Sequence, residues 1–125
     1  MIREVWYTSF VMGLDAYGKV KSPEGEVEEI AYWRKHNALH GWMESLYRKK
    51  GGTEEFNCVP LELNETDLEL LELVVTSGML PETQGFFFGG DTRFCEDYKE
   101  QTLNFIKVAR GYLSRGWEVA YDSWW

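Results

Sequence analysis

The sequence of 125 residues has no apolar run near the roughly 18 continuous residues of a membrane-spanning helix, so we expect no membrane contact. It also has no Cys-x-x-Cys pair. We expect its two cysteines, Cys58 and Cys95, to be reduced and packed, although a disulfide between them stays open. Glu4 lies at the front of the amino-terminal apolar run and no small-residue cleavage pattern follows, so a signal peptide is not expected.

Basic residues are missing from the segment 51–92, which contains nine acidic residues and no Lys or Arg. The rest of the chain is nearly neutral, with thirteen bases and twelve acids, so this segment accounts for the net charge of −8. Nucleic-acid binding is not expected, because phosphate contacts require a basic stripe. The segment is either a solvated face or a surface for a basic partner. The partner-binding candidates on it are Glu65, Asp67, Glu69 and Glu72.

Apolar and aromatic residues are abundant, at 44% and 16% of the chain. Such a composition excludes general disorder, and the length is typical of a single domain with a substantial core. We therefore expect one α+β domain over residues 1–125, in which a small mixed or antiparallel sheet packs with three helices. The helices are predicted over about 26–50, 66–77 and 92–114, and the strands over about 3–8, 14–21, 55–63, 83–90 and 117–125.

Local signals set the expected boundaries. Residues 22–25, Ser-Pro-Glu-Gly, predict a turn, and the acidic residues that follow suit the first turn of the long helix. Thr66 and Glu69 form a potential capping box for the second helix, and Asn64 is an alternative cap. Asp91 and Thr92 are expected to cap the third helix. Pro60 implies that the strand at 55–63 lies at an edge or begins after the proline.

The long predicted helix carries two Trp, two Tyr and both histidines of the protein. On a helical wheel, Trp33, His36 and His40 share one broad arc, so they are expected to face a common interior wall or a ligand. A glycine pair at 89–90 precedes another predicted helix, where a phosphate or carboxylate could bind. The ligand-binding candidates are Tyr32, Trp33, Arg34, His36, His40, Phe87 and Gly89.

His36 and His40 are four residues apart, which is the spacing of metal-binding histidines on a helix, and Glu29 precedes His36 by one heptad. These three residues are weak candidates for a zinc or iron site. Asn37 stands where a hydrolytic zinc helix has its glutamate, and buried, hydrogen-bonded histidines are more typical of such a setting. We therefore predict no metal and no cofactor.

Recognised catalytic signatures are missing as well. The sequence contains no Gly-x-Ser-x-Gly, no Walker sequence and no serine in a pattern that marks a nucleophile. We nominate no catalytic residue, and an enzymatic function has no support from the sequence.

Four stretches resemble a set of small, uncharacterised proteins encoded by bacteriophages and prophages. The stretches are Met12–Tyr17, Glu29–Trp42, Leu80–Gly89 and Trp117–Trp125. The resemblance covers most of the chain after about residue 12, and residues 32–42 and 86–88 are its most specific parts. Such proteins sometimes carry the label phosphoglycerate kinase, but this chain is too short for a two-domain kinase and lacks phosphate-binding signals. The resemblance implies a phage accessory protein in the cytoplasm of the infected host.

Three functional hypotheses follow. The first is a non-catalytic phage accessory protein that binds a host protein through the acidic segment or the aromatic helix, with inhibition of a host defence protein as one role by class analogy. The second is a small-ligand or nucleotide-binding domain, enzymatic or not, with an aromatic, His and Arg pocket. The third is an acidic DNA mimic, which predicts regularly spaced exposed carboxylates.

Overall fold

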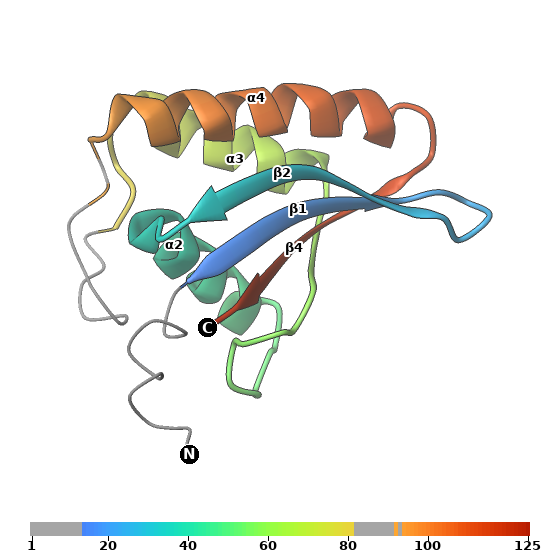
Figure 1. The fold of residues 1–125 in the computed structure, drawn as a ribbon, viewed down its shortest axis with the longest axis horizontal. Coiled ribbons are helices and arrows are strands. Elements are labelled where there is room, and N and C mark those ends of the chain that lie inside the picture. Colours follow the sequence, from blue (N-terminus) through green and yellow to red (C-terminus); the bar gives the residue numbers. More distant parts are fainter. Residues whose placement is uncertain (1–13, 82–91, 93) are drawn as a thin grey trace, which may run out of the picture.

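The computed structural model describes residues 14–81, 92 and 94–125, and within them four strands form one antiparallel sheet (Figure 1). The strands are β1 (Asp15–Lys21), β2 (Val27–Arg34), β3 (Leu61–Leu63) and β4 (Glu118–Trp124), in the order β2-β1-β4-β3. The helices are α2 (Asn37–Lys49), α3 (Glu65–Thr76) and α4 (Glu96–Leu113). The predicted α+β fold is confirmed. The strands predicted at 3–8 and 83–90 lie outside the described residues.

β1 and β2 form a hairpin through the turn predicted at residues 22–25. The Gly25 N–H donates to the Ser22 carbonyl at 2.9 Å, and Gly25 has a φ of +98°, which glycine adopts without strain. The register between the strands shifts between Gly18 and Lys19, so Ile30 is an extra residue in β2. Such a bulge bends and twists an edge strand, which makes it a poorer template for further strand pairing.

The helix predicted over about 26–50 is wrong in its first third, because residues 27–34 form β2 and α2 begins only at Asn37. The burial of β2 alternates where it crosses the core: Trp33 is buried, and its neighbours Tyr32 and Arg34 are exposed. Lys35 then adopts a left-handed φ of +59° and separates the strand from the helix. The acidic residues thought to open the helix therefore lie on or beside a strand, and the first turn of α2 has none.

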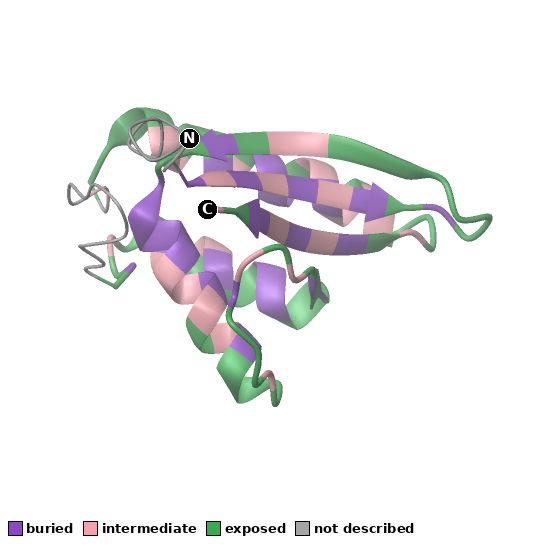
Figure 2. Cartoon of the chain, turned by 60° about the horizontal axis from the view of Figure 1, so that its bottom comes forward, coloured by how far each residue is buried: buried purple, intermediate pink, exposed green. Residues whose placement is uncertain are grey.

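All three described helices pack on one face of the sheet, and none of them covers the opposite face, which we call the open face (Figures 1 and 2). Along β1 and β4, buried residues alternate with partly exposed ones, as a sheet covered on one side requires. From α4, the Phe105 ring meets the Trp33 ring edge-on at 5.1 Å between centroids. From α2, His40 lies beside Tyr121 of β4. The largest fully buried side chains include Trp33, Tyr121, Phe56, Phe105, Leu39, Met43, Leu68 and Leu71.

The predicted helix ends were right in part. Asn64 caps α3: its Oδ1 accepts from the Asp67 N–H at 2.8 Å, and Asp67 Oδ2 accepts from the Asn64 N–H at 3.0 Å. The alternative cap is thus confirmed and the Thr66–Glu69 box is wrong. Gly78, with φ +72°, follows the end of α3, where glycine adopts the left-handed conformation without strain. The cap predicted at residues 91–92 is wrong, because α4 begins at Glu96 after Cys95.

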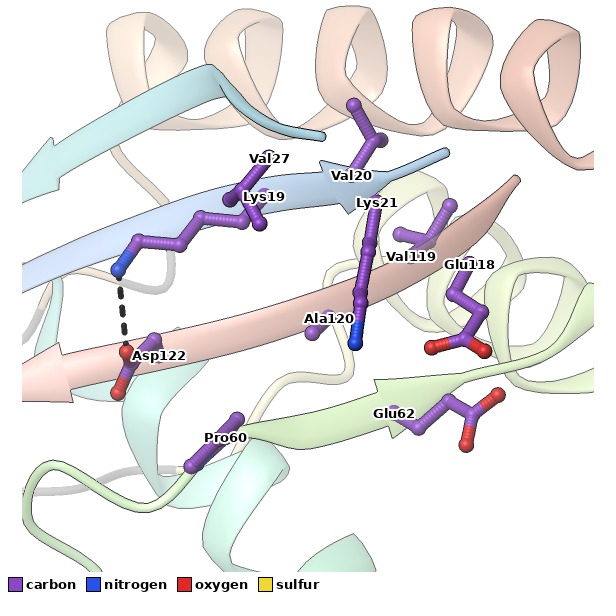
Figure 3. Close-up of a pocket in the computed structure, with 10 residues that line it drawn as sticks. All are labelled: Lys19, Val20, Lys21, Val27, Pro60, Glu62, Glu118, Val119, Ala120 and Asp122. Carbon is purple, nitrogen blue, oxygen red and sulfur yellow. Dashed lines mark hydrogen bonds and ion pairs between the residues drawn. The ribbon is translucent and has the colours of Figure 1, made fainter. Parts of the chain in front are cut away.

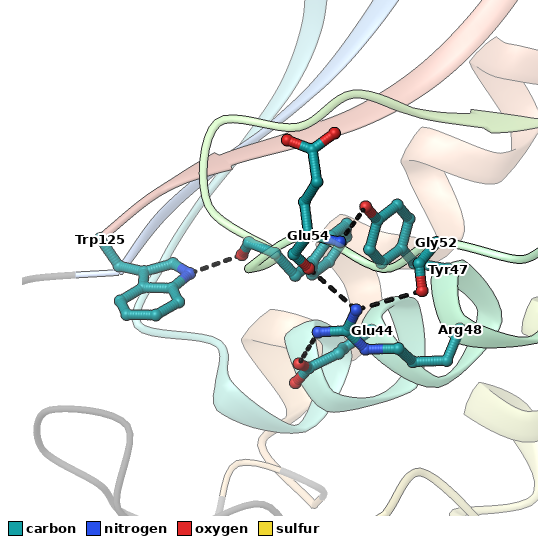
Figure 4. Close-up of polar contacts among 7 residues, drawn as sticks. Glu44, Tyr47, Arg48, Gly52, Glu54 and Trp125 are labelled. Carbon is teal, nitrogen blue, oxygen red and sulfur yellow. Dashed lines mark hydrogen bonds and ion pairs between the residues drawn. The ribbon is translucent and has the colours of Figure 1, made fainter.

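The connection from α2 to β3 is pinned at both ends (Figure 4). Arg48 donates to the carbonyls of Gly52 and Glu54, at 3.2 and 2.8 Å. At the other end, the Trp125 indole Nε1 donates to the Phe56 carbonyl at 2.8 Å. β3 begins only after Pro60 and lies at an edge of the sheet, so both predicted alternatives for this strand hold.

The two cysteines are free and exposed, so the prediction that they are packed in the interior is wrong. Cys58 has a φ of +61° in the connection to β3, and its backbone N–H donates to the Ser123 carbonyl at 2.7 Å. The strand predicted for this segment, 55–63, would have buried alternate side chains. The observed irregular path exposes this thiol.

Candidate partner-binding surface

The structure divides the predicted ligand-binding residues between two faces of the sheet. Trp33, His36 and His40 are buried, whereas Tyr32 and Arg34 are exposed. Tyr32 donates from its hydroxyl to Asp15 Oδ1 at 2.6 Å, and this bond raises the Tyr32 pKa to about 12. Phe87 and Gly89 lie outside the described residues. These side chains therefore do not surround a common cavity in the described part of the chain.

His36 is held by its neighbours. Its ring stacks on Tyr98, with 4.4 Å between centroids, and its Nδ1 lies 2.8 Å from Thr92 Oγ1. The same Oγ1 accepts from the Ala38 N–H at 3.0 Å and so satisfies one of the amides at the start of α2. Thr92, expected to cap the third helix, thus supports α2 instead. Burial lowers the His36 pKa to about 4.

His40 makes a polar contact within the aromatic core. Its Nδ1 lies 2.9 Å from the Tyr121 hydroxyl, and its ring stacks on Phe56 at 5.1 Å. Burial lowers the His40 pKa to about 4 and raises the Tyr121 pKa well above its usual value. Both imidazoles are therefore neutral at pH 7. They support the interior wall expected from the sequence, which Trp33 shares through its 6.2 Å contact with Tyr121.

The three weak metal candidates are not brought together. Glu29 is opposite Lys19 of β1 and is exposed on the open face, because cross-strand partners share a face. His36 and His40 point into the core on the other side. Among residues 14–81, 92 and 94–125, no group of three or more His, Cys, Asp or Glu side chains is arranged to hold a metal ion.

The four acidic candidates of α3 have different roles. Asp67 is buried, and Lys50 Nζ lies 2.6 Å from its Oδ2. Glu65 and Glu72 both pair with Arg110 of α4, at 3.1 and 3.0 Å. Glu69 is exposed and forms no ion pair with the described residues. Most of these carboxylates fasten α3 to its neighbours, so α3 does not present the regular row of free acids that the DNA-mimic hypothesis requires.

What α3 does expose is apolar. Leu68, Leu71 and Val75 face the core, but Leu70 and Leu73 are 48% and 62% exposed on the other side of the helix. A surface helix normally carries one apolar stripe, and α3 carries two. The signal was present in the sequence, because six of the eight residues from Leu68 to Val75 are apolar, more than one buried stripe needs.

The second stripe borders a groove between α3 and α2 with a volume of about 410 Å³. Trp42 and Leu46 of α2 form one wall, and Leu70 and Val74 of α3 form the other. Leu73 continues the apolar area over the crest of α3, next to Glu69, where the surface is again hollowed. The α2–α3 surface, as we call it, consists of Trp42, Leu46, Leu70, Leu73 and Val74.

The area beyond the end of α3 is apolar as well. Met79 and Phe94 are both exposed there. The Phe94 ring packs close to Gly78: a Cβ atom added to Gly78 would lie 3.5 Å from Phe94 Cε1. Four of the seven large exposed apolar side chains of the described residues therefore lie on α3 or at its carboxyl end. Contiguous exposed apolar area of this kind marks interaction sites in monomers.

Another hollow, of about 380 Å³, lies on the open face of the sheet around Ala120 (Figure 3). Its charged lining is mixed: Lys19 and Lys21 come from β1, and acidic residues come from β3 and β4. Lys19 is already paired with Asp122 at 3.2 Å. This hollow contains none of the predicted ligand-binding residues, and its two basic and three acidic side chains do not form a binding group of one charge.

Comparison with known proteins adds no relative. No protein-family model, no curated protein and no solved structure matches the chain. Within the described residues, no helix combines the length and apolarity needed to cross a bilayer. The candidate site therefore depends on the geometry of α2 and α3.

Proposed function

We propose that this chain is a non-catalytic binding protein that holds a partner protein on its α2–α3 surface. The observation that carries the proposal is the second apolar stripe of α3, with Leu70 and Leu73 exposed beside a groove of matching chemistry. Leaving two leucines in water costs hydrophobic free energy, which a bound partner would recover. The buried histidines, neutral at pH 7, are committed to the core rather than to chemistry at the surface.

Together with the resemblance to phage proteins, this surface supports a phage accessory protein that captures a host protein in the cytoplasm of the infected cell. Inhibition of a host defence protein is one role such capture would serve. The small-ligand alternative has less support, because its candidate residues divide between the core and the open face.

The test compares two double variants in a capture experiment from host lysate, read by mass spectrometry. Leu70→Glu/Leu73→Glu should lose the captured protein, because two charges would replace the apolar centre of the surface. Val27→Glu/Trp124→Glu is the matched control: both residues are exposed and apolar, but they lie on β2 and β4, away from the helices. Circular dichroism and thermal melting must first show that both variants fold as the wild type does.

Binding of the captured protein must then be measured with that protein and each form of this chain in purified form. Loss of binding in the α3 variant alone supports the proposal. Equal binding by both variants, or loss in the control alone, contradicts it.

A further inference from the structure

From the same surface, and resting on the proposed function, we infer the chemistry of the partner: a helix with an apolar stripe, flanked by basic residues on the edge that faces α3. The geometry comes first. Trp42 and Leu46 are spaced i, i+4 on α2, and Leu70, Leu73 and Val74 are spaced i, i+3, i+4 on α3. Two helices that offer ridges at these spacings form a groove into which the ridges of a third helix fit.

Length also fits a helix. α3 has 12 residues, so it is about 18 Å long at 1.5 Å per residue. A partner helix of roughly three to four turns would lie along the groove and cover the exposed stripe. A strand from the partner has a poorer template among the described strands, because the edge strand β2 is bulged and acidic and the other edge strand, β3, has only three residues.

The negative charge of α3 indicates which charged side chains the partner helix carries. Along α3 there are no basic residues, and Glu69 stands beside Leu70 and Leu73 in the hollow on its outer side. Glu65 and Glu72 share one guanidinium, that of Arg110, so α3 keeps an excess of negative charge. Lysine or arginine on the partner edge nearest α3 would complement Glu69.

The opposite wall has the opposite charge. Lys49 of α2 lines the groove, across from Leu70 and Val74. An acidic side chain on the second edge of the partner helix would complement it. Glu69 and Lys49 together therefore determine the orientation of the bound helix. Its basic edge faces α3 and its acidic edge faces α2.

A second copy of this chain meets the same requirement less well. Its α3 helix has no basic residue to offer Glu69, so only Lys49 of its α2 would supply the complementary charge on this surface, and two chains of net charge −8 repel. A heterologous helix that carries positive charge is therefore the occupant the surface favours.

The experiment selects helical peptides of about 15 residues on the immobilised full-length protein, from a displayed library. The apolar stripe of these peptides is fixed and both polar edges are randomised. We expect enrichment of Lys or Arg on one edge and of Asp or Glu on the other. Binding of the enriched peptides, measured by fluorescence anisotropy, should fall roughly hundredfold in Leu70→Glu/Leu73→Glu.

Charge swaps then test the orientation. A repeated selection on Glu69→Lys should reverse the preference on the first edge, and Lys49→Glu should reverse it on the second. Enriched peptides without a charge preference, or a preference that neither swap changes, would overturn the inferred partner chemistry.

Other outcomes separate the inference from the proposed function. Peptides that need Leu70 and Leu73 but carry neutral or acidic edges would overturn the inference and leave the proposed function standing. Peptides that bind equally to the leucine variant, or a selection that enriches no peptide, would contradict both. Sedimentation analysis of the wild type that reveals a dimer abolished in the leucine variant would overturn the inference by placing a second copy on the surface.

Discussion

Gly18 of β1 lies against the ring of Phe105 of α4, so closely that a Cβ at Gly18 would be 2.4 Å from Phe105 Cε1. Phe105 is fully buried and in contact with Trp33, so its ring has little room to move. We expect Gly18→Ala to lower the free energy of unfolding by about 1–3 kcal/mol through overpacking. Urea denaturation of the wild type and the variant measures this difference.

Gly111 provides the control for this substitution. It lies within α4, and nothing is within 4 Å of its Cβ position. Gly111→Ala should raise the free energy of unfolding by about 0.5–1 kcal/mol, because alanine loses less backbone entropy in a helix. Equal effects of the two substitutions would mean that β1 and α4 are not packed as described.

The two apolar stripes of α3 predict a contrast between neighbouring leucines. Leu71→Ala should cost about 2–5 kcal/mol of unfolding free energy, because Leu71 is fully buried and its removal leaves a cavity. Leu73→Ala should change that free energy by less than about 0.5 kcal/mol, because Leu73 is 62% exposed. Chemical denaturation of both variants checks the contrast, and a large cost at Leu73 would show that the second stripe is covered by this chain itself.

Asp67 should matter to stability more than any other carboxylate of α3. Asp67→Ala removes the acceptor for the Asn64 N–H and the partner of Lys50, so the free energy of unfolding should fall by about 1–3 kcal/mol. Glu69→Ala, on the exposed side of the same helix, should have an effect within about 0.5 kcal/mol. Thermal melting of the two variants measures this difference. A larger loss of stability in Glu69→Ala than in Asp67→Ala would contradict the described contacts of Asp67.

Acid should destabilise the fold through its two histidines. The folded chain keeps both imidazoles neutral down to about pH 4, whereas the unfolded chain protonates them below their ordinary pKa of 6.5. Their contribution to stability is therefore complete above pH 6.5 and is lost as the pH falls toward 4. Each histidine should lower the free energy of unfolding by about 1.4 kcal/mol per pH unit in this window.

Urea denaturation between pH 6.5 and 5 isolates this effect, because carboxylates titrate mainly below that range. His36→Gln and His40→Gln should each remove about half of the pH dependence. If the free energy of unfolding keeps its full pH dependence in both variants, groups other than these two histidines cause that dependence.

The sequence predicted the architecture better than the elements around the site. The strands predicted at about 14–21 and 117–125 are both present, and the second of them was predicted from its alternation. Residues 27–34 fit a helical wheel too, since Trp33 lies on the same arc as His36 and His40. Only the pairing with β1 decides for a strand, and that contact joins residues that a local pattern cannot relate.

The candidate surface was harder to predict for the same reason. The acidic residues of α3 suggested a charged face, but three of them pair with Lys50, which follows α2, and with Arg110 of α4. The exposed Leu70 and Leu73 have the same chemistry as the buried Leu68 and Leu71, so composition cannot tell which apolar residues of the helix the core will cover. Thr92 likewise accepts a hydrogen bond from Ala38 of α2, a residue 54 positions earlier in the chain.

The pairing of β1 with β4 has a consequence for the order of folding. Lys19 and Asp122, which bridge these central strands, are 103 residues apart in the chain. The hairpin of β1 and β2 can form locally, but its inner edge stays without a neighbour until the last strand arrives. Closing so long a loop makes the step slow compared with helix formation. In pulse-labelled hydrogen exchange, the amides of β4 should therefore gain protection in a single late phase, together with the Trp33 indole beneath the sheet.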